Sequence, residues 1–309
     1  MRTSRTPKGN LTRGGLAIAA ALLALWLVPG SAAAKDLNRP LILVHGHEAD
    51  SGVSCNGTWK DLMAHFRIYG YKGPFYPIEY YKNDTACNTY YGSGKSLRIS
   101  SATSDTPIQQ IAKDLAWHVY YINVATGQGV NVVAHSMGGL VVRYMIDQVQ
   151  RHKSGWPPNI TVPSVVTLGT PHNGIEMGPF FAGCRISGDS DECRQMDKSS
   201  SFIEYLRGNA RNPQGAFGTW WSLGGSHADN TVDEGSATDM SVKYKIHWAS
   251  DTNIEHSDYM HEKLGDNPFN HAQSITAHCW GTTTGSNFTE GKCYWPIQWA
   301  FTIIGYYGY

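Results

Sequence analysis

One short segment limits what this chain can fold into, because it places a serine between a strand-like run and a helix-like run. Residues 130–134 are mostly apolar and include three valines, as in a buried strand, and residues 138–150 have the apolar spacing of a helix. Between them stands Ser136, with the small residues Ala134 and Gly138 two positions away on either side. A strained strand-to-helix turn of this kind exposes the serine side chain. The segment predicts an α/β architecture with Ser136 as a candidate nucleophile.

The rest of the chain alternates strand-like and helix-like patterns. Short apolar runs predict strands at 41–44, 75–78, 164–168, 219–223 and 243–248. Helical spacing predicts one helix at 58–69 and another that starts at Pro107, capped by Asp105 or Thr106, and ends at Gly127. This alternation predicts a mostly parallel central sheet with helices on both faces.

A second motif, His45-Gly46-His47, directly follows the first predicted strand. Stabilising an oxyanion requires two backbone N–H groups aimed at one point. Met137, directly after the candidate nucleophile, can supply one of them, and His47 stands at the place of the other. The main chain of His47 would act there, and not its imidazole. The sequence therefore predicts an oxyanion hole formed by His47 and Met137.

Three motifs resemble those of the α/β-hydrolase lipases and esterases, at residues 43–46, 134–144 and 168–174. The Ala-x-Ser-x-Gly turn is similar to that of small secreted bacterial lipases of the triacylglycerol lipase type. The resemblance covers residues 40–175, is weaker as far as residue 262 and is absent in the C-terminal tail. It implies an α/β-hydrolase fold that hydrolyses carboxylic esters through a Ser-His-Asp triad and an acyl-enzyme, with no cofactor.

The triad acid should follow the predicted strand 219–223, because the order in this fold is nucleophile, acid, histidine. Asp229 fits the spacing in the family it resembles, since it stands beyond a Gly-Ser pair and ahead of a valine. Asp233, in the same loop, is the alternative. The resemblance therefore favours Asp229 as the acid.

The catalytic histidine has to be chosen from 13 in the chain. The loop after the predicted strand 243–248 offers His256, which precedes a small residue and a helix-like stretch, as in the family it resembles. His261 is an alternative, and His247 is discounted because it falls within the strand. His256 is the predicted base.

The alternation of strands and helices breaks between residues 173 and 218, which include an amphipathic piece at 202–206. An insertion of this size over a hydrolase sheet is a candidate lid or cleft wall. Apart from this insertion, we expect residues 35–309 to form one catalytic domain.

Residues 1–34 have the pattern of a secretory signal peptide. Four basic residues and no acidic ones accompany an apolar run at 14–28, and three alanines at 32–34 offer a cleavage site. An uncleaved N-terminal anchor is the alternative. Without this segment the chain holds 21 basic and 25 acidic residues, a net charge of −4 that favours solubility and does not point to nucleic acid. We expect a secreted, extracellular protein.

Six cysteines follow the leader, and an even number in an exported protein indicates disulfides. They are Cys55, Cys87, Cys184, Cys193, Cys279 and Cys293. The pairing is formally open, but short loops favour Cys184–Cys193 and Cys279–Cys293, which leaves Cys55–Cys87. A metal site is disfavoured because the sequence has no Cys-x-x-Cys pair.

The resemblance implies an acyl ester or a lipid as substrate, with a lipid–water interface as one place of action. We expect a monomer, and the charge balance does not indicate a nucleic-acid partner. Secreted lipases can hold a structural calcium, but no metal ligand set stands out in this sequence. A polyester hydrolase, a thioesterase or an amidase with the same triad is the alternative, because the fold does not fix the pocket. A non-catalytic binding module of this fold is a further alternative, and it would not react with a fluorophosphonate.

Overall fold

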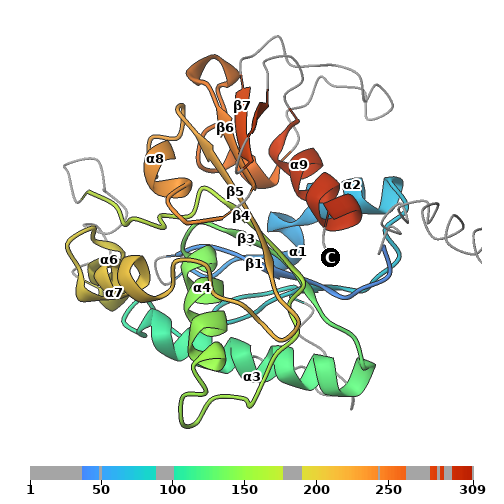
Figure 1. The fold of residues 1–309 in the computed structure, drawn as a ribbon, viewed down its shortest axis with the longest axis vertical. Helices are drawn as coiled ribbons and strands as arrows, with labels where there is room; N and C mark the ends of the chain where they lie inside the picture. Colours follow the sequence, from blue (N-terminus) through green and yellow to red (C-terminus); the bar gives the residue numbers. More distant parts are fainter. Residues whose placement is uncertain are drawn as a thin grey trace, which may run out of the picture. The chain divides into compact units, whose positions relative to one another are not determined.

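The computed structural model (Figure 1) describes residues 37–48, 51–87, 101–176, 190–242, 244–261, 279–283, 286–288 and 294–307. All of them fall within the unit Lys35–Tyr309. The predicted leader at 1–34 lies outside the described residues, and so do residues 177–189 of the predicted insertion.

Within these residues, eight strands form one sheet in the order β2-β1-β3-β4-β5-β6-β7-β8. The strands are β1 (Leu41–Val44), β2 (Phe75–Pro77), β3 (Asn131–His135), β4 (Ser164–Leu168), β5 (Trp220–Ser226), β6 (Tyr244–Trp248), β7 (Cys279–Thr283) and β8 (Ser286–Phe288). Strands β1 to β6 pair in parallel, and β7 and β8 join antiparallel at one edge. The predicted mostly parallel sheet is confirmed.

The register of the parallel strands brings loops that are distant in sequence to one edge of the sheet. Val44 at the end of β1 lies opposite Ala134 of β3, and His135 at the end of β3 lies opposite Leu168 of β4. Leu168 in turn lies opposite Gly224 of β5. Because parallel strands share their carboxyl edge, the residues that follow β1, β3 and β5 meet there, where ligands bind in open α/β sheets.

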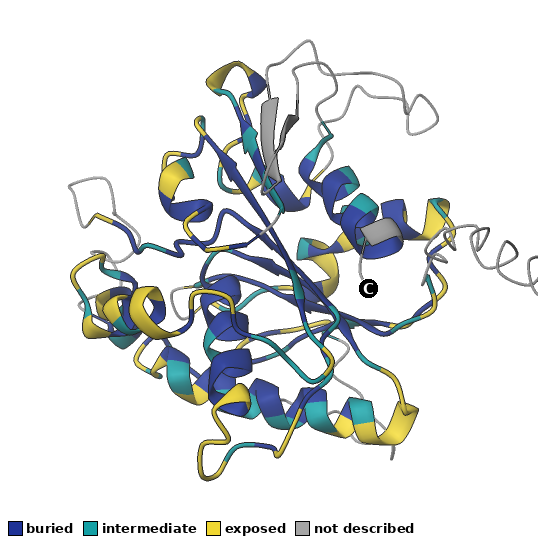
Figure 2. Cartoon of the chain, in the orientation of Figure 1, coloured by how far each residue is buried: buried dark blue, intermediate teal, exposed yellow. Residues whose placement is uncertain are grey.

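Helices lie on both faces of the sheet, as predicted (Figure 1). They are α1 (Cys55–Thr58), α2 (Lys60–Ile68), α3 (Ile108–Thr126), α4 (Met137–Gln150), α6 (Asp191–Met196), α7 (Ser201–Asn209), α8 (Glu234–Ala237), α9 (Pro296–Thr302), the 3-10 helices η1 (Ser250–Thr252) and η2 (Asp258–Met260), and the π-helical turn η3 (Ile303–Tyr307). Ile42 and Val44 of β1 pack in one core with α3, α4 and α7, whereas Leu41 and Leu43 pack in another with α2 and α9. Figure 2 shows the buried strands between these two layers.

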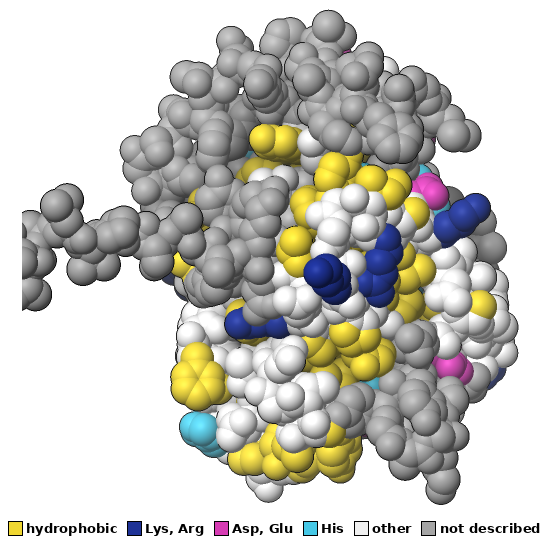
Figure 3. Space-filling model, turned by 90° about the vertical axis from the view of Figure 1, so that its right-hand side faces the viewer, with side chains coloured by type: hydrophobic (Ala, Val, Ile, Leu, Met, Phe, Trp, Pro, Cys, Tyr) yellow, Lys and Arg dark blue, Asp and Glu magenta, His cyan; other side chains and the backbone are white. Residues whose placement is uncertain are grey.

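The C-terminal aromatic run docks on the domain as α9, whose Ile297, Trp299 and Phe301 are buried. A view of this side of the molecule (Figure 3) shows hydrophobic and basic side chains intermingled among the described residues, with a few acidic and histidine side chains. Among those residues, none of the helices is long and apolar enough to cross a bilayer.

Helix α3 starts later than predicted, and neither Asp105 nor Thr106 caps it. Pro107 occupies the N-cap position and no side chain bonds there as a cap. Instead, the N–H of Ile108 donates to Oε1 of Gln195 in α6 at 2.8 Å. Local sequence pattern cannot reveal this partner, because it lies 87 residues further along the chain.

Strand β5 runs past its predicted end at residue 223 and continues to Ser226. Glycine usually weakens a strand, and the added residues include Gly224 and Gly225. The structure shows why glycine is needed. A Cβ atom on Gly224 would lie 2.7 Å from the ring of Trp248, and one on Gly225 would lie 2.9 Å from the Cβ of Ala237.

Two smaller boundaries also differ. The helix predicted at 58–69 is two helices, α1 and α2, which meet at Trp59. The strand predicted at 243–248 is described from Tyr244 onward, since residue 243 lies outside the described residues.

A disulfide joins Cys55 to Cys87, as predicted. Cys193 is disulfide-bonded as well. Cys184, its predicted partner, lies outside the described residues. The predicted Cys279–Cys293 disulfide cannot be compared either, since the side chains of both cysteines lie outside the described part of the chain. The Cys55–Cys87 bond closes the segment that contains β2 and the loop after it, which adjoins the end of β1.

Removing this bond should destabilise the domain. The double replacement Cys55→Ser/Cys87→Ser opens a loop of sequence separation 32. Chain entropy predicts that the free energy of unfolding then falls by about 3–4 kcal/mol. Urea unfolding followed by tryptophan fluorescence measures the change against wild type in the same buffer. An unchanged midpoint and slope would show that the bond contributes nothing to stability.

Candidate active site

Ser136 occupies the sharp turn between β3 and α4 in a conformation that non-glycine residues rarely adopt. Its φ is 53° and its ψ is −134°. Its N–H donates to the carbonyl of Leu168 at the end of β4 at 3.0 Å. A Cβ atom on Gly138 would lie 2.3 Å from the carbonyl oxygen of His45, so no side chain fits there. These contacts give the strand-turn-helix geometry of a nucleophile elbow.

His256 lies between η1 and η2, with its imidazole facing Ser136. The Ser136 hydroxyl donates to Nε2 of His256 at 2.9 Å. On the other side of the ring, Nδ1–H donates to Oδ2 of Asp229 at 2.8 Å. Three loops, after β3, β5 and η1, thus bring together the three side chains that the sequence selected.

Asp229 is fixed within its loop as well as by His256. Its Oδ1 accepts hydrogen bonds from the N–H groups of Thr231 at 2.8 Å and Val232 at 2.9 Å, and its side chain is fully buried. Gly169 leaves room for it: φ there is +57°, and a Cβ atom would lie 3.2 Å from Oδ2 of Asp229 and 2.5 Å from the ring of Tyr259. The carboxylate therefore has one orientation, with Oδ2 toward His256.

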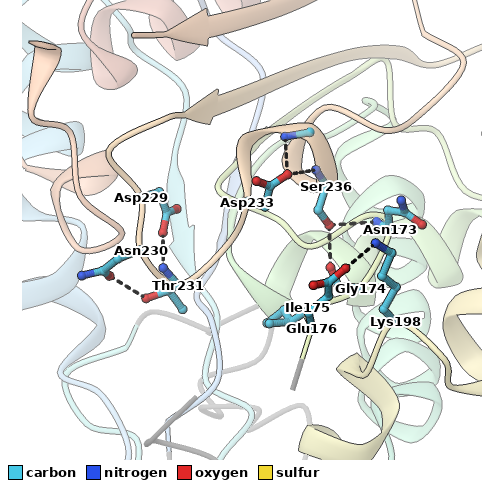
Figure 4. Close-up of a pocket in the computed structure, with 11 residues that line it drawn as sticks. Asn173, Gly174, Ile175, Glu176, Lys198, Asp229, Asn230, Thr231, Asp233 and Ser236 are labelled. Carbon is cyan, nitrogen blue, oxygen red and sulfur yellow. Dashed lines mark hydrogen bonds and ion pairs between the residues drawn. The ribbon is translucent and has the colours of Figure 1, made fainter. Parts of the chain in front are cut away.

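Asp233, the alternative acid, has a different task. It caps α8, where its Oδ1 accepts from the N–H of Gly235 at 2.9 Å and of Ser236 at 3.3 Å. Figure 4 shows Asp229 and Asp233 on opposite sides of their loop, beside a polar cavity of about 620 Å³ that both line. The structure places Asp229, and not Asp233, against His256.

The alternative histidines have other carboxylate partners. His247 lies in β6 and contacts Glu234, and Nδ1 of His261 lies 3.2 Å from Oδ2 of Asp61. His135 is buried next to the site, and this burial, followed by the proximity of His256, lowers the pKa of His135 well below its usual value. The neutral ring donates from Nε2 to the carbonyl of His256 at 2.8 Å, and so helps to orient His256.

The loop after β1 runs directly beside the serine. A Cβ atom on Gly46 would lie 2.7 Å from the Cβ of Ser136, so only glycine allows this approach. The single hydroxyl proton of Tyr80 is shared between the carbonyls of His45 and Gly46, whose oxygens lie 2.7 Å and 2.6 Å from the hydroxyl oxygen. The N–H of His47 has no acceptor within the part of the chain that the structure describes.

A cavity of about 350 Å³ opens over Ser136 and His256, and His47, Thr231 and Met260 are among its walls. Met137 is buried at the first position of α4, where helix N–H groups lack intrahelical acceptors. The predicted oxyanion donors thus flank the serine on two sides. The same cavity shares Asn230 and Thr231 with the polar cavity of Figure 4.

Asp84 is a supporting residue of the candidate site that the sequence analysis did not identify. Nε2–H of His45 donates to its Oδ2 at 3.1 Å, and Oδ2 also accepts from the N–H groups of Tyr80 and Tyr81. Burial raises the pKa of Asp84, but its hydrogen bonds lower it more, and the net pKa is below the usual value. The side chains of His45, Cys55 and Asp84 lie close enough together to bind a metal ion, but the sulfur of Cys55 is already part of the disulfide. Asp84 therefore anchors the loop after β1.

The parallel sheet and the serine elbow at its carboxyl edge define an α/β-hydrolase. Within that class, the chain belongs to the palmitoyl protein thioesterase family, whose family model matches residues 40–215. The predicted α/β-hydrolase superfamily is thereby confirmed.

Solved structures that are similar to this chain include three bacterial and fungal proteins. Lipase B of Aspergillus fumigatus is 17% identical over 69% of this chain and 43% of its own, with a TM-score of 0.44. Mature lipase BlEst2 of Bacillus licheniformis is 17% identical over 64% and 69%, with a TM-score of 0.41. The lin2722 gene product of Listeria innocua is 14% identical over 73% and 89%, with a TM-score of 0.42. The chain spans less than half of the Aspergillus lipase, and no curated protein matches its sequence.

Proposed function

We propose that this protein is a serine hydrolase that cleaves carboxylic esters through an acyl-enzyme, with Ser136, His256 and Asp229 as its catalytic triad. One observation carries the proposal: the unbroken hydrogen-bond chain from the Ser136 hydroxyl through both nitrogens of His256 to Asp229. The strained backbone at Ser136 supports it, because strain of this kind collects at active sites.

In the proposed reaction, Oγ of Ser136 attacks the ester carbonyl while Nε2 of His256 takes the hydroxyl proton. Asp229 holds the ring in the tautomer that exposes Nε2 and stabilises the imidazolium that forms. The N–H groups of His47 and Met137 bind the oxyanion. His256 then protonates the leaving oxygen, and the carbonyl re-forms as an acyl-serine.

The second half of the cycle repeats these roles with water as the nucleophile. His256 takes a proton from water as its oxygen attacks the acyl carbon, and then returns it to Oγ of Ser136. A carboxylic acid leaves and the serine is free again. Each proton that His256 accepts is given back, so the residues of this chain suffice for the cycle.

The family match favours a second candidate substrate, a thioester, which the same triad can cleave. A thiolate is a better leaving group than an alkoxide, and the acyl-enzyme is identical for both.

We also propose that the protein is secreted, acts as a monomer and meets its acyl substrate at a lipid–water interface. The leader pattern and the Cys55–Cys87 disulfide support export, since disulfides persist in oxidising compartments.

Hydrolysis of matched ester and thioester series tests the proposal. The p-nitrophenyl esters from acetate to stearate and the corresponding thioesters would be compared, together with labelling by a fluorophosphonate. We expect turnover of esters and labelling confined to Ser136. A preference for thioesters at equal acyl length would assign the alternative substrate class. Failure to label Ser136, with no turnover of any acyl compound, would refute catalysis and leave a binding module.

A further inference from the structure

Glu192, the second residue of α6, is a fully buried carboxylate that has no role in the proposed reaction. Its Oε2 accepts hydrogen bonds from Nδ1–H of His47 at 2.5 Å and from the hydroxyl of Tyr81 at 2.5 Å. Its Oε1 has no hydrogen-bond partner in the part of the chain that the structure describes. Removing a carboxylate from water is unfavourable unless good hydrogen bonds compensate for it, so the groups that Glu192 binds have to be examined.

The imidazole of His47 faces α6 with both of its nitrogens. Nδ1 bonds Glu192, and Nε2 lies 3.8 Å from the sulfur of Cys193, which is disulfide-bonded. Helix α6 is itself fixed, because the N–H of Glu192 donates to the carbonyl of Ser104 at 3.1 Å, just ahead of α3. The side chain of His47 is therefore held by a helix of the insertion that is anchored to the domain.

The main chain of the same residue borders the reaction site. Gly46 lies against Ser136, and its carbonyl is fixed by Tyr80, as described above. The same peptide group carries the N–H of His47, which has no acceptor among the described residues. The orientation of this peptide thus depends on two contacts. Tyr80 binds its carbonyl oxygen, and Glu192 and Tyr81 bind the imidazole of His47.

We propose that Glu192 is a positioning residue for the oxyanion hole. By holding the imidazole of His47, it aims the main-chain N–H of His47 at the oxygen of the carbonyl that Ser136 attacks. The inference rests on the proposed function and adds to it: a buried carboxylate from the insertion, distant in sequence from the triad, sets the geometry of transition-state binding.

The variants Glu192→Gln and Glu192→Ala test this role. Loss of an oxyanion donor costs about 10²–10³ in rate, and a displaced donor should cost less, so we expect kcat to fall about 10- to 100-fold in Glu192→Ala. KM should stay within about threefold, because the ground-state carbonyl gains little from the donor. Glu192→Gln keeps the size of the side chain and should retain more activity than Glu192→Ala. Rates would be divided by the concentration of active sites, titrated to completion with a fluorophosphonate.

A transition-state analogue separates positioning from a purely structural role. The Ki of an alkyl trifluoromethyl ketone, whose adduct places an oxyanion in the hole, should rise by about the same factor as kcat/KM falls. His47→Ala removes the imidazole but keeps the N–H. It should therefore show a similar loss, and His47→Ala/Glu192→Gln should be no worse than the more impaired single variant.

Asp147→Asn is the matched control. Asp147 is another buried carboxylate, in the last turn of α4, and it bonds Arg151 and Tyr205 away from the cleft. We expect this variant to lose stability while kcat per active site and the Ki of the ketone remain unchanged.

Unchanged kcat and Ki in both Glu192 variants, or a change confined to KM, would overturn the positioning role while leaving the proposed function intact. A wild-type protein without serine-dependent turnover would instead remove the proposed function, and the oxyanion role with it. If Glu192→Ala does not fold, the isosteric Glu192→Gln and the His47→Ala variant decide the question by the same two readouts.

Discussion

If Ser136 is the nucleophile, replacing it by alanine is expected to lower kcat for ester hydrolysis by about 10⁶-fold, as the loss of the nucleophile does in known serine hydrolases. His256→Ala should lose about as much, because Nε2 of His256 is the atom that accepts the serine proton. The double variant Ser136→Ala/His256→Ala should be no slower than either single variant. Nucleophile and base act as one unit, so removing the second residue causes no further loss of rate.

Steady-state hydrolysis of a p-nitrophenyl ester measures these rates, with thermal unfolding to show that each variant is folded. Ser241→Ala is a suitable control, because Ser241 is exposed and bonds only Arg211 among the contacts described for it. Its rate should equal that of wild type. If the effects of Ser136→Ala and His256→Ala multiplied in the double variant, the two residues would be acting independently, which a triad does not allow.

The elements nearest to the serine could be predicted from sequence because their causes are local. The apolar strand, the small residues and the apolar helix around Ser136 are adjacent in the chain. Steric limits on a sharp turn leave few other arrangements for such a segment. The loops that carry Asp229 and His256 were found by their order along the chain, and the residues within them by their resemblance to the family spacing. The parallel sheet explains why the order identifies the loops. Each loop that follows a strand returns to the same edge.

The residues that support the site could not be predicted because their partners are far away in sequence. Glu192 meets His47 across 145 positions, and Asp84 meets His45 across 39. Neither carboxylate belongs to a sequence motif or directly follows a predicted strand. In the sequence, each therefore resembles a solvated loop residue. The choice between Asp229 and Asp233 had the opposite difficulty. The two lie in one loop, and only their hydrogen bonds separate a triad acid from a helix cap.

Asp229→Asn is expected to lower kcat by about 10⁴-fold, whereas Asp233→Asn should leave it within about threefold of wild type. An asparagine at 229 can present its amide N–H to Nδ1 of His256, which then acts as an acceptor. The proton of the neutral ring moves to Nε2, the atom that has to accept the proton of Ser136. The geometry of the site would be kept while its chemistry is blocked, so binding of substrate should change little.

Asp233→Asn is a demanding control because it removes the same charge from the same loop. Asparagine is as good an N-cap as aspartate, so α8 keeps its bonds to Gly235 and Ser236 and the fold should lose little stability. Comparing kcat and unfolding midpoints of the two variants separates the acid of the triad from a structural carboxylate. The assignment of Asp229 fails if Asp233→Asn is the slower enzyme, or if both variants are impaired equally. In the first case the loop must rearrange before it reacts, since Asp233 now faces α8 and not His256.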